Sequence, residues 1–217
     1  MKIAQTTGNE HDDAVFQRLD LIPSHNYPTR IYAKRLAWEW VQRLLIRPSP
    51  TRAYGWRRFW LRLFGAKLHF TCLVRAGARI LHPWLLTVGR HSILGDCTIW
   101  NLGPVSIGDH TVLSQNVYVC AGMHDYTRRD FPLQSPPIRI GSGVWICAGA
   151  FIGPKANVGN NSVVGACAVV LGEVPAGMIV GGNPARVIKP RLMRTGSSNT
   201  VMFCNPEGGT AARDNSQ

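Results

Sequence analysis

The sequence predicts a mainly β fold, a parallel β-helix in which the chain turns a corner every six residues. An aliphatic residue returns at each sixth position in one long stretch: Ile140, Ile146, Ile152, Val158, Val164 and Val170. A glycine or cysteine usually follows it, and a small or β-branched residue occupies the fifth place. An α-helix cannot keep such a set on one face, because its period is 3.6 residues. We therefore expect the aliphatic side chains to point inward and the glycines to permit close approach at the corners.

The same register continues toward the N-terminus. It passes through Ile107, Leu113 and Val119, then Val88 and Leu94, and more weakly through Leu68, Val74 and Ile80. Because three hexads make one triangular coil, residues Leu68 to Pro175 predict about five coils. Residues Asp125 to Arg139 interrupt the register with a charged, proline-containing segment. Insertions in a solenoid project from one face, often the binding face, so we expect a protruding loop at about residues 125–139.

The remaining segments flank this single domain. A chain of 217 residues is long enough for one solenoid with extensions. We expect a mobile N-terminus at 1–29, a basic helical segment at 30–67, the β-helix at 68–192 and a disordered tail at 193–217. The polar start is not typical of a secretory signal, and no apolar run approaches the roughly 20 residues that cross a bilayer. The scattered cysteines contain no Cys-x-x-Cys pair, so we expect them to be reduced and the protein to be cytoplasmic.

The net charge of +12 is concentrated in the basic segment. Between Arg30 and Lys67 the chain carries ten Lys or Arg and a single acid, Glu39. Apolar residues at helical spacing predict two helices, separated by Pro48 and Pro50. These apolar sets are Ala33, Leu36, Ala37, Trp40, Val41 and Leu44, and then Trp56, Phe59, Trp60, Leu63 and Phe64. The simpler interpretation is that both faces cover the first coil. Peripheral contact with the inner face of an anionic membrane is the alternative or an addition, and no motif indicates nucleic-acid binding.

His124 is the candidate catalytic residue. It ends the hexad that begins at Val119, immediately before the long insertion. A histidine at a coil edge, beside a loop able to cover a cleft, is well placed as a general base, although a surface histidine at a loop junction gives the same pattern. We expect no metal site, because His91, His110 and His124 occupy unlike places in their hexads, whereas a zinc site needs its ligands clustered at one edge.

The chain resembles the left-handed parallel β-helix acyltransferases. Within them it is most similar to the bacterial sugar O-acetyltransferases of the colanic acid, galactoside and nodulation groups. The stretches that carry the likeness are Leu61–Lys67, His82–Trp84, Trp100–Leu102, His124–Tyr126, Gly143–Ile146 and Gly181–Ala185. The likeness covers roughly residues 50–192 and implies left-handed crossovers. It also implies a homotrimer with clefts between neighbouring prisms, and acetyl-CoA as the co-substrate.

The resemblance assigns roles around the reacting groups. His124 would remove the proton from an acceptor hydroxyl as it attacks the thioester, and a backbone N–H would stabilise the oxyanion. A carboxylate or a main-chain carbonyl would hold the other ring nitrogen, and Asp125 is a weak candidate for it. Trp145 matches a tryptophan near the acyl and acceptor groups, or is an outward aromatic at the trimer contact. Asn101 could bind an acceptor sugar or satisfy the bulged backbone after Trp100.

The resemblance also implies a binding path for the co-substrate. Ala148 and Ala166 match positions whose backbone contacts the pantetheine arm. Arg186 and Lys189 match basic residues near the adenosine 3′-phosphate, where charge pairing explains the residue type. The chain departs from its relatives at Val170–Glu173, where a lysine that contacts the co-substrate is missing.

These observations predict an acetyl-CoA-dependent O-acetyltransferase. The expected acceptor is a sugar or a lipid-linked glycan in exopolysaccharide or surface-glycan biosynthesis. An acetyltransferase for a free small molecule, such as serine or an antibiotic, remains an alternative, and activity on soluble acceptors at low concentration would favour it. A non-catalytic trimeric scaffold would fail to bind acetyl-CoA. A γ-type carbonic anhydrase would contain metal.

Overall fold

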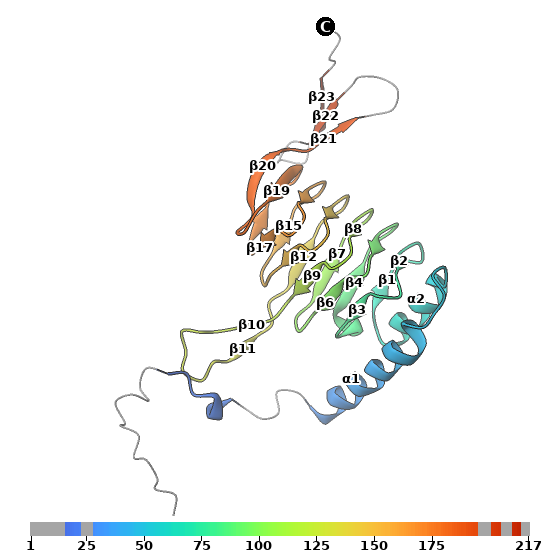
Figure 1. The fold of residues 1–217 in the computed structure, drawn as a ribbon, viewed down its shortest axis with the longest axis vertical. Coiled ribbons are helices and arrows are strands. Elements are labelled where there is room, and N and C mark those ends of the chain that lie inside the picture. The colour runs from blue at the N-terminus through green and yellow to red at the C-terminus, as the bar shows by residue number, and fades with distance from the viewer. Residues whose placement is uncertain (1–15, 23–27, 195–200, 205–209, 214–217) are drawn as a thin grey trace, which may run out of the picture.

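The computed structural model describes residues 16–22, 28–194, 201–204 and 210–213. Its centre is a parallel β-helix built from three sheets, which run along the body of the molecule (Figure 1). Sheet A contains β1 (Lys67–Leu68), β4 (Leu86–Val88), β7 (Val105–Ile107), β12 (Ile138–Ile140), β15 (Asn157–Val158) and β18 (Glu173–Val174). Sheet B contains β2 (Leu73–Val74), β5 (Ile93–Leu94), β8 (Val112–Leu113), β13 (Trp145–Ile146), β16 (Val163–Val164), β19 (Met178–Gly181) and β20 (Arg186–Pro190). Sheet C contains β3 (Arg79–Ile80), β6 (Thr98–Trp100), β9 (Tyr118–Cys120), β14 (Phe151–Ile152) and β17 (Val169–Val170).

The predicted hexads set the register of these sheets. Ile140 pairs with Val158, Ile146 with Val164, and Ile152 with Val170. All six of these side chains are buried, so the aliphatic positions line the interior as expected. The number of coils is larger than the expected five. Sheet C has five strands, whereas sheet A has six, so an incomplete sixth coil follows β17 through β18 and β19.

Two helices cover the open end of the first coil (Figure 1). The first, α1 (Thr29–Val41), continues as a π-helical turn, η2 (Gln42–Ile46), and the second is α2 (Tyr54–Leu63). The sequence predicted that Leu36, Trp40 and Leu44 face the first coil. This prediction is wrong, because these three side chains are exposed and Trp38 is buried instead. Hydrogen bonding explains this orientation. The Trp38 indole Nε1 donates to the carbonyl of Ile80 at 2.7 Å, and the Gln42 side chain accepts from the Ile80 N–H at 2.9 Å.

Arginines of α2 donate hydrogen bonds to other main-chain carbonyls of the first coil. Arg57 Nε donates to the Val74 carbonyl at 2.6 Å, and Arg58 donates to the Cys72 carbonyl at 2.9 Å. Arg62 Nε donates to the Leu68 carbonyl at 3.0 Å. An uncovered strand edge offers its free carbonyls to other chains, so these contacts close the end of the solenoid. Part of the basic charge in residues 30–67 is therefore used inside the fold.

The expected loop is a β-hairpin that projects from the solenoid between β9 and β12 (Figure 1). Its strands are β10 (Met123–His124) and β11 (Leu133–Gln134), which pair in antiparallel fashion. Near the hairpin tip, the N–H of Arg18 donates to the Arg129 carbonyl at 2.7 Å, which brings the 3-10 turn η1 (Leu19–Leu21) to this loop.

The C-terminal segment differs in part from the expected disordered tail at 193–217. Strands β21 (Leu192–Arg194), β22 (Val201–Cys204) and β23 (Thr210–Arg213) form an antiparallel sheet. The rest of that tail, and most of the N-terminus expected to be mobile, lie outside the described residues. Within the described ranges, no helix is both long and apolar enough to cross a membrane.

Candidate active site

The hairpin holds His124 in one orientation. The side chain is partly buried, and its Nδ1 lies 2.8 Å from the main-chain carbonyl oxygen of Phe131. The imidazole stacks on the Phe131 ring with centroids 4.3 Å apart and an interplanar angle of 4°. Because a carbonyl can only accept, Nδ1 carries the proton in the neutral ring and Nε2 keeps its lone pair. The arrangement presents Nε2 as a proton acceptor.

The hairpin backbone fixes the position of that carbonyl. Phe131 adopts a positive φ of 42°, and its N–H donates to the Arg128 carbonyl at 3.1 Å. The Asp125 carboxylate accepts hydrogen bonds from the side chain and the N–H of Thr127, at 2.6 and 3.1 Å. These bonds lower the pKa of Asp125. Asp125 therefore shapes the turn, and the ring nitrogen of His124 is held by a main-chain carbonyl.

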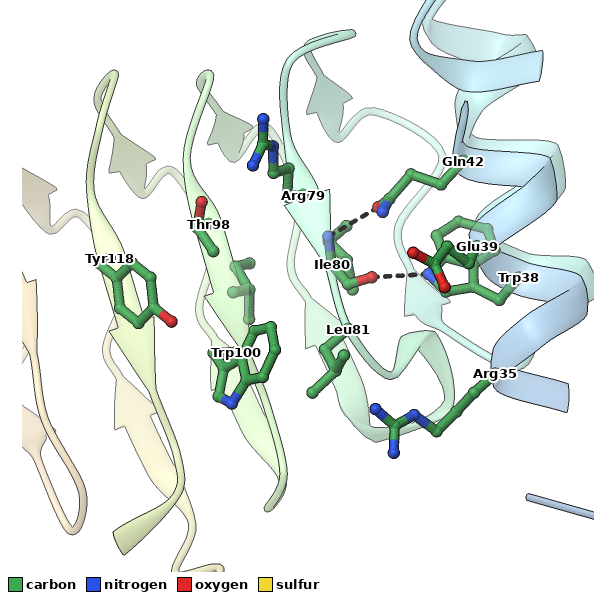
Figure 2. Close-up of a pocket in the computed structure, with 11 residues that line it drawn as sticks. Arg35, Trp38, Glu39, Gln42, Arg79, Ile80, Leu81, Thr98, Trp100 and Tyr118 are labelled. Carbon is green, nitrogen blue, oxygen red and sulfur yellow. Dashed lines mark hydrogen bonds between the residues drawn. The ribbon is translucent and has the colours of Figure 1, made fainter. Parts of the chain in front are cut away.

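A groove lies between α1 and the outer face of sheet C (Figure 2). It has a volume of about 400 Å³. Figure 2 shows Arg35 reaching in from the helix and Trp100 standing on β6, with Tyr118 on the next strand. Glu39, Arg79 and Thr98 add polar groups to the lining. Trp100 pairs in register with Cys120, which precedes His124 by four residues, so the Trp100 end of the groove is next to the base of the hairpin.

Asn101 does not line this groove. Its side chain is fully buried, where Oδ1 accepts from the His82 N–H at 2.9 Å and Nδ2 donates to the His82 carbonyl at 2.6 Å. This corresponds to the structural alternative, in which Asn101 satisfies the backbone at a coil corner. The other alternative, in which Asn101 binds an acceptor sugar, would require these two hydrogen bonds to break. Trp100, the residue before it, is the one that faces the groove.

His82 gives the fold a predictable response to acid. It follows β3, just before the 3-10 turn η3 (Pro83–Leu85), and is 1% exposed. Burial, assisted by the charge of Arg35, lowers its pKa from 6.5 to about 4. Below pH 6.5 the unfolded chain binds a proton that the folded chain excludes, so stability falls as the pH drops toward 4. We expect the melting temperature to fall between pH 7 and pH 5, and to fall less in His82→Gln. Equal slopes for the two proteins would contradict this assignment.

The residues expected to bind the co-substrate lie at a different corner. Trp145 is exposed on β13 in sheet B, where its Nε1 donates to Ser114 Oγ at 3.1 Å. Ala148 and Ala166 occupy the same corner of consecutive coils, between sheets B and C, and the Cys167 N–H donates to the Ala148 carbonyl at 3.0 Å. Ala148 is partly exposed and Ala166 is exposed, so both small side chains lie at the surface of this corner.

The predicted phosphate-binding residues lie on β20, which pairs with β19 in antiparallel fashion. Val180 of β19 pairs with Val164 of the preceding coil. The next residue, Gly181, pairs with Arg186. Arg186 therefore continues the edge marked by Ala148 and Ala166. Lys189 pairs with Ile179 and is further along the strand. Both side chains are exposed.

Within one chain, His124 and the residues expected to bind the co-substrate lie at different corners of the prism. His124 leaves the corner between sheets C and A, whereas Trp145, Ala148 and Ala166 lie on sheet B and its corner with sheet C. His91 and His110 stack at the third corner, with centroids 5.0 Å apart. Among the described residues, no group of three or more His, Cys, Asp or Glu is arranged to hold a metal.

Comparisons with known proteins identify the family. The model of the bacterial transferase hexapeptide (six repeats) matches residues 137–172. WcaF of Escherichia coli (strain K12), which is named as a colanic acid biosynthesis acetyltransferase, is 39% identical over 156 residues, or 71% of this chain and 86% of that protein. The chain belongs to the hexapeptide-repeat acetyltransferases. Nodulation protein L of Rhizobium meliloti (strain 1021) is 40% identical over 106 residues, which cover 47% of this chain and 58% of that protein.

Solved structures of hexapeptide-repeat acetyltransferases share the architecture. Galactoside acetyltransferase in complex with coenzyme A aligns with a TM-score of 0.70 and 25% identity, over 76% of this chain and 84% of that one. The acetyltransferase VCA0836 of Vibrio cholerae, complexed with acetyl coenzyme A, aligns with a TM-score of 0.67 and 28% identity, over 79% and 94% of the two chains. Both of these neighbours were solved with coenzyme A or its acetyl thioester bound.

Proposed function

We propose that this acetyltransferase transfers the acetyl group of acetyl-CoA to a sugar hydroxyl, in the cytoplasm, during the biosynthesis of an exopolysaccharide or another surface glycan. The observation that carries this proposal is the contact between His124 Nδ1 and the Phe131 carbonyl. It leaves Nε2 as a base on the hairpin that follows β9, the strand that carries Tyr118 of the groove. A non-catalytic scaffold has no need for a histidine held in this way.

The proposed reaction is direct transfer with His124 as the general base. Nε2 accepts the proton of the acceptor hydroxyl, whose oxygen forms a bond to the thioester carbon. The tetrahedral intermediate then collapses, the carbon–sulfur bond breaks, and the imidazolium returns its proton to the departing thiolate. The Phe131 carbonyl stabilises the imidazolium during this sequence, since it accepts the Nδ1 hydrogen throughout.

The acceptor is proposed to occupy the groove on sheet C. Trp100 and Tyr118 offer partly exposed aromatic surface, while Arg35, Glu39 and Arg79 offer charged hydrogen-bonding groups. Such a lining fits a sugar ring, which has apolar C–H faces and a polar rim. Relatives named for colanic acid, galactoside and lipopolysaccharide acetylation support a carbohydrate acceptor.

The complete site is proposed to form between subunits of a homotrimer. The base at one corner of the prism and the open edge at another can meet only if two prisms lie side by side. The edge marked by Ala148 and Ala166 would take the pantetheine arm, and Arg186 would pair with a phosphate of the co-substrate, with Lys189 further along β20. Trp145 would then face the reacting groups of the neighbouring chain.

Analysis of the product tests the proposed chemistry. The protein is incubated with isotopically labelled acetyl-CoA and one class of acceptor at a time. The acceptors are sugars, glycan precursors, serine and aminoglycoside antibiotics. We expect label in a carbohydrate product, and we expect mild alkali to release it, because esters are alkali-labile and amides are not. Labelled serine or antibiotic would favour the small-molecule alternative. No label in any acceptor, together with no binding of acetyl-CoA, would favour the scaffold.

Substitution of Trp100 tests the position of the acceptor. We expect Trp100→Ala to raise the KM for the acceptor by roughly 10-fold, because an aromatic contact of about 1.4 kcal/mol is lost. The KM for acetyl-CoA should stay unchanged, since Trp100 lies on sheet C. Phe70→Ala is a matched control, because Phe70 is an exposed aromatic of the first coil that does not line the groove. An unchanged acceptor KM in Trp100→Ala would place the acceptor elsewhere.

A further inference from the structure

The cap formed by α1, η2 and α2 carries a row of large apolar side chains on its outer surface. Leu36 and Trp40 on α1 and Leu44 in η2 are spaced four residues apart and are more than half exposed. Trp56, Phe59 and Leu63 on α2 are 44–62% exposed. The Trp56 Nε1 donates to the carbonyl of Leu45, the residue after Leu44, at 2.8 Å, so the two rows meet. We call these six residues the outer cap face.

The inner side of the cap already covers the first coil and pairs its main-chain carbonyls. Trp38, Arg57 and Leu61 are buried, and the carbonyls of the first coil are paired with donors from the helices. The outer cap face is therefore not needed to close the fold. Large contiguous apolar surface on a soluble domain marks an interaction site.

The surrounding charge indicates the kind of partner. Arg30, Arg43, Arg47 and Arg52 are exposed on the same helices and the connecting loop. The single acid of this segment, Glu39, is paired with Arg43 at 2.6 Å. Two copies joined through this face in a two-fold dimer would bring like rows of arginines together, which opposes self-association. Arginines around exposed tryptophan and leucine fit instead the anionic headgroups and the interface of a lipid bilayer.

We infer that the outer cap face rests on an anionic lipid surface, which presents the acetyltransferase to a membrane-bound acceptor. This inference rests on the proposed function for its purpose and for the trimer, whereas the surface chemistry of a single cap is independent of catalysis. The described helices cannot span a bilayer, so the cap lies in the plane of the interface. In a trimer of parallel prisms, all three caps lie at the same end, and three weak contacts reinforce one another.

Vesicle co-sedimentation of the full chain tests the inference. The vesicles are phosphatidylcholine alone, or phosphatidylcholine with phosphatidylglycerol. We expect binding only to the anionic vesicles, and we expect Leu36→Ser/Trp40→Ser/Phe59→Ser to weaken it by roughly 10-fold or more. Arg43→Gln/Arg47→Gln/Arg52→Gln should weaken it and remove its salt dependence. Leu171→Ser is the matched control, because Leu171 is a comparably exposed leucine at the turn after β17, far along the solenoid from the cap.

The other outcomes are equally informative. Absence of vesicle binding by the wild type would overturn the inference, as would equal binding by the wild type and the Leu36/Trp40/Phe59 variant. A change in sedimentation coefficient of that variant, without vesicle binding by the wild type, would show that the face is an interface between copies of the chain. His124→Ala should bind vesicles as the wild type does, so a failure of the proposed chemistry and a failure of the lipid contact are distinguishable.

Discussion

Replacement of His124 by alanine is expected to lower kcat for acetyl transfer by about 10²- to 10⁴-fold, the range typical of a general base. The KM for acetyl-CoA should change little, because the edge marked by Ala148 and Ala166 belongs to a different corner of the prism. His124→Asn should be equally inactive. An asparagine amide can still donate to the Phe131 carbonyl, but it has no basic nitrogen to take the hydroxyl proton.

A second histidine provides the matched control for this prediction. His110 lies at the corner between sheets A and B with a φ of 53°, a conformation that asparagine tolerates. His110→Asn should therefore fold and retain wild-type kcat. If His124→Asn keeps activity within about threefold of His110→Asn, then His124 is not the base, since the loss would be less than about 1 kcal/mol.

Replacement of Arg57 by methionine is expected to produce the largest loss of stability. The buried guanidinium donates to the Val74 carbonyl at 2.6 Å, to the carbonyls of Pro50 and Thr51 at 2.8 and 2.6 Å, and to Ser49 Oγ at 2.8 Å. Methionine fills much of the volume but leaves these acceptors without a donor. The expected loss is about 3 kcal/mol. In a chain of this size it lowers the melting temperature by roughly 6–12 °C.

Arg52→Met is the control for this substitution, because Arg52 is an exposed residue of the loop that precedes α2. Its effect should stay within about 0.5 kcal/mol. Thermal unfolding followed by circular dichroism compares the three proteins at one scan rate. A melting temperature of Arg57→Met equal to that of Arg52→Met would show that the helices do not depend on these bonds.

The sequence predicted the solenoid well and its ends less well, for a physical reason. An inward position that repeats every sixth residue constrains side-chain type directly, so the register of Ile140, Ile146 and Ile152 was visible. The orientation of α1 depends on main-chain carbonyls of the first coil, which leave no trace in side-chain hydrophobicity. Trp38 and Arg57 turn inward to reach them, and this places Leu36 and Trp40 outside.

The sequence predicted the candidate base but not the groups around it. His124 could be selected because it ends a hexad directly before the insertion. Its partner could not, since the Phe131 carbonyl is a main-chain group positioned by the turn of the hairpin. Trp100 ends β6 and Asn101 begins the corner that follows, and the path of the backbone at this junction decides which of them faces the groove. The contribution of α1 to the groove is a tertiary contact without a local signal.

The central claim is that His124 catalyses acetyl transfer from acetyl-CoA to a sugar hydroxyl. Its most direct test measures free-thiol release from acetyl-CoA with a panel of sugars and glycan precursors, comparing the wild type with His124→Ala. We expect at least one carbohydrate to give acceptor-dependent turnover that falls by about 10²-fold or more in the variant. Turnover that survives the substitution would contradict the assignment of the base. Acceptor-dependent release with serine or an antibiotic, but with no carbohydrate, would contradict the proposed substrate class.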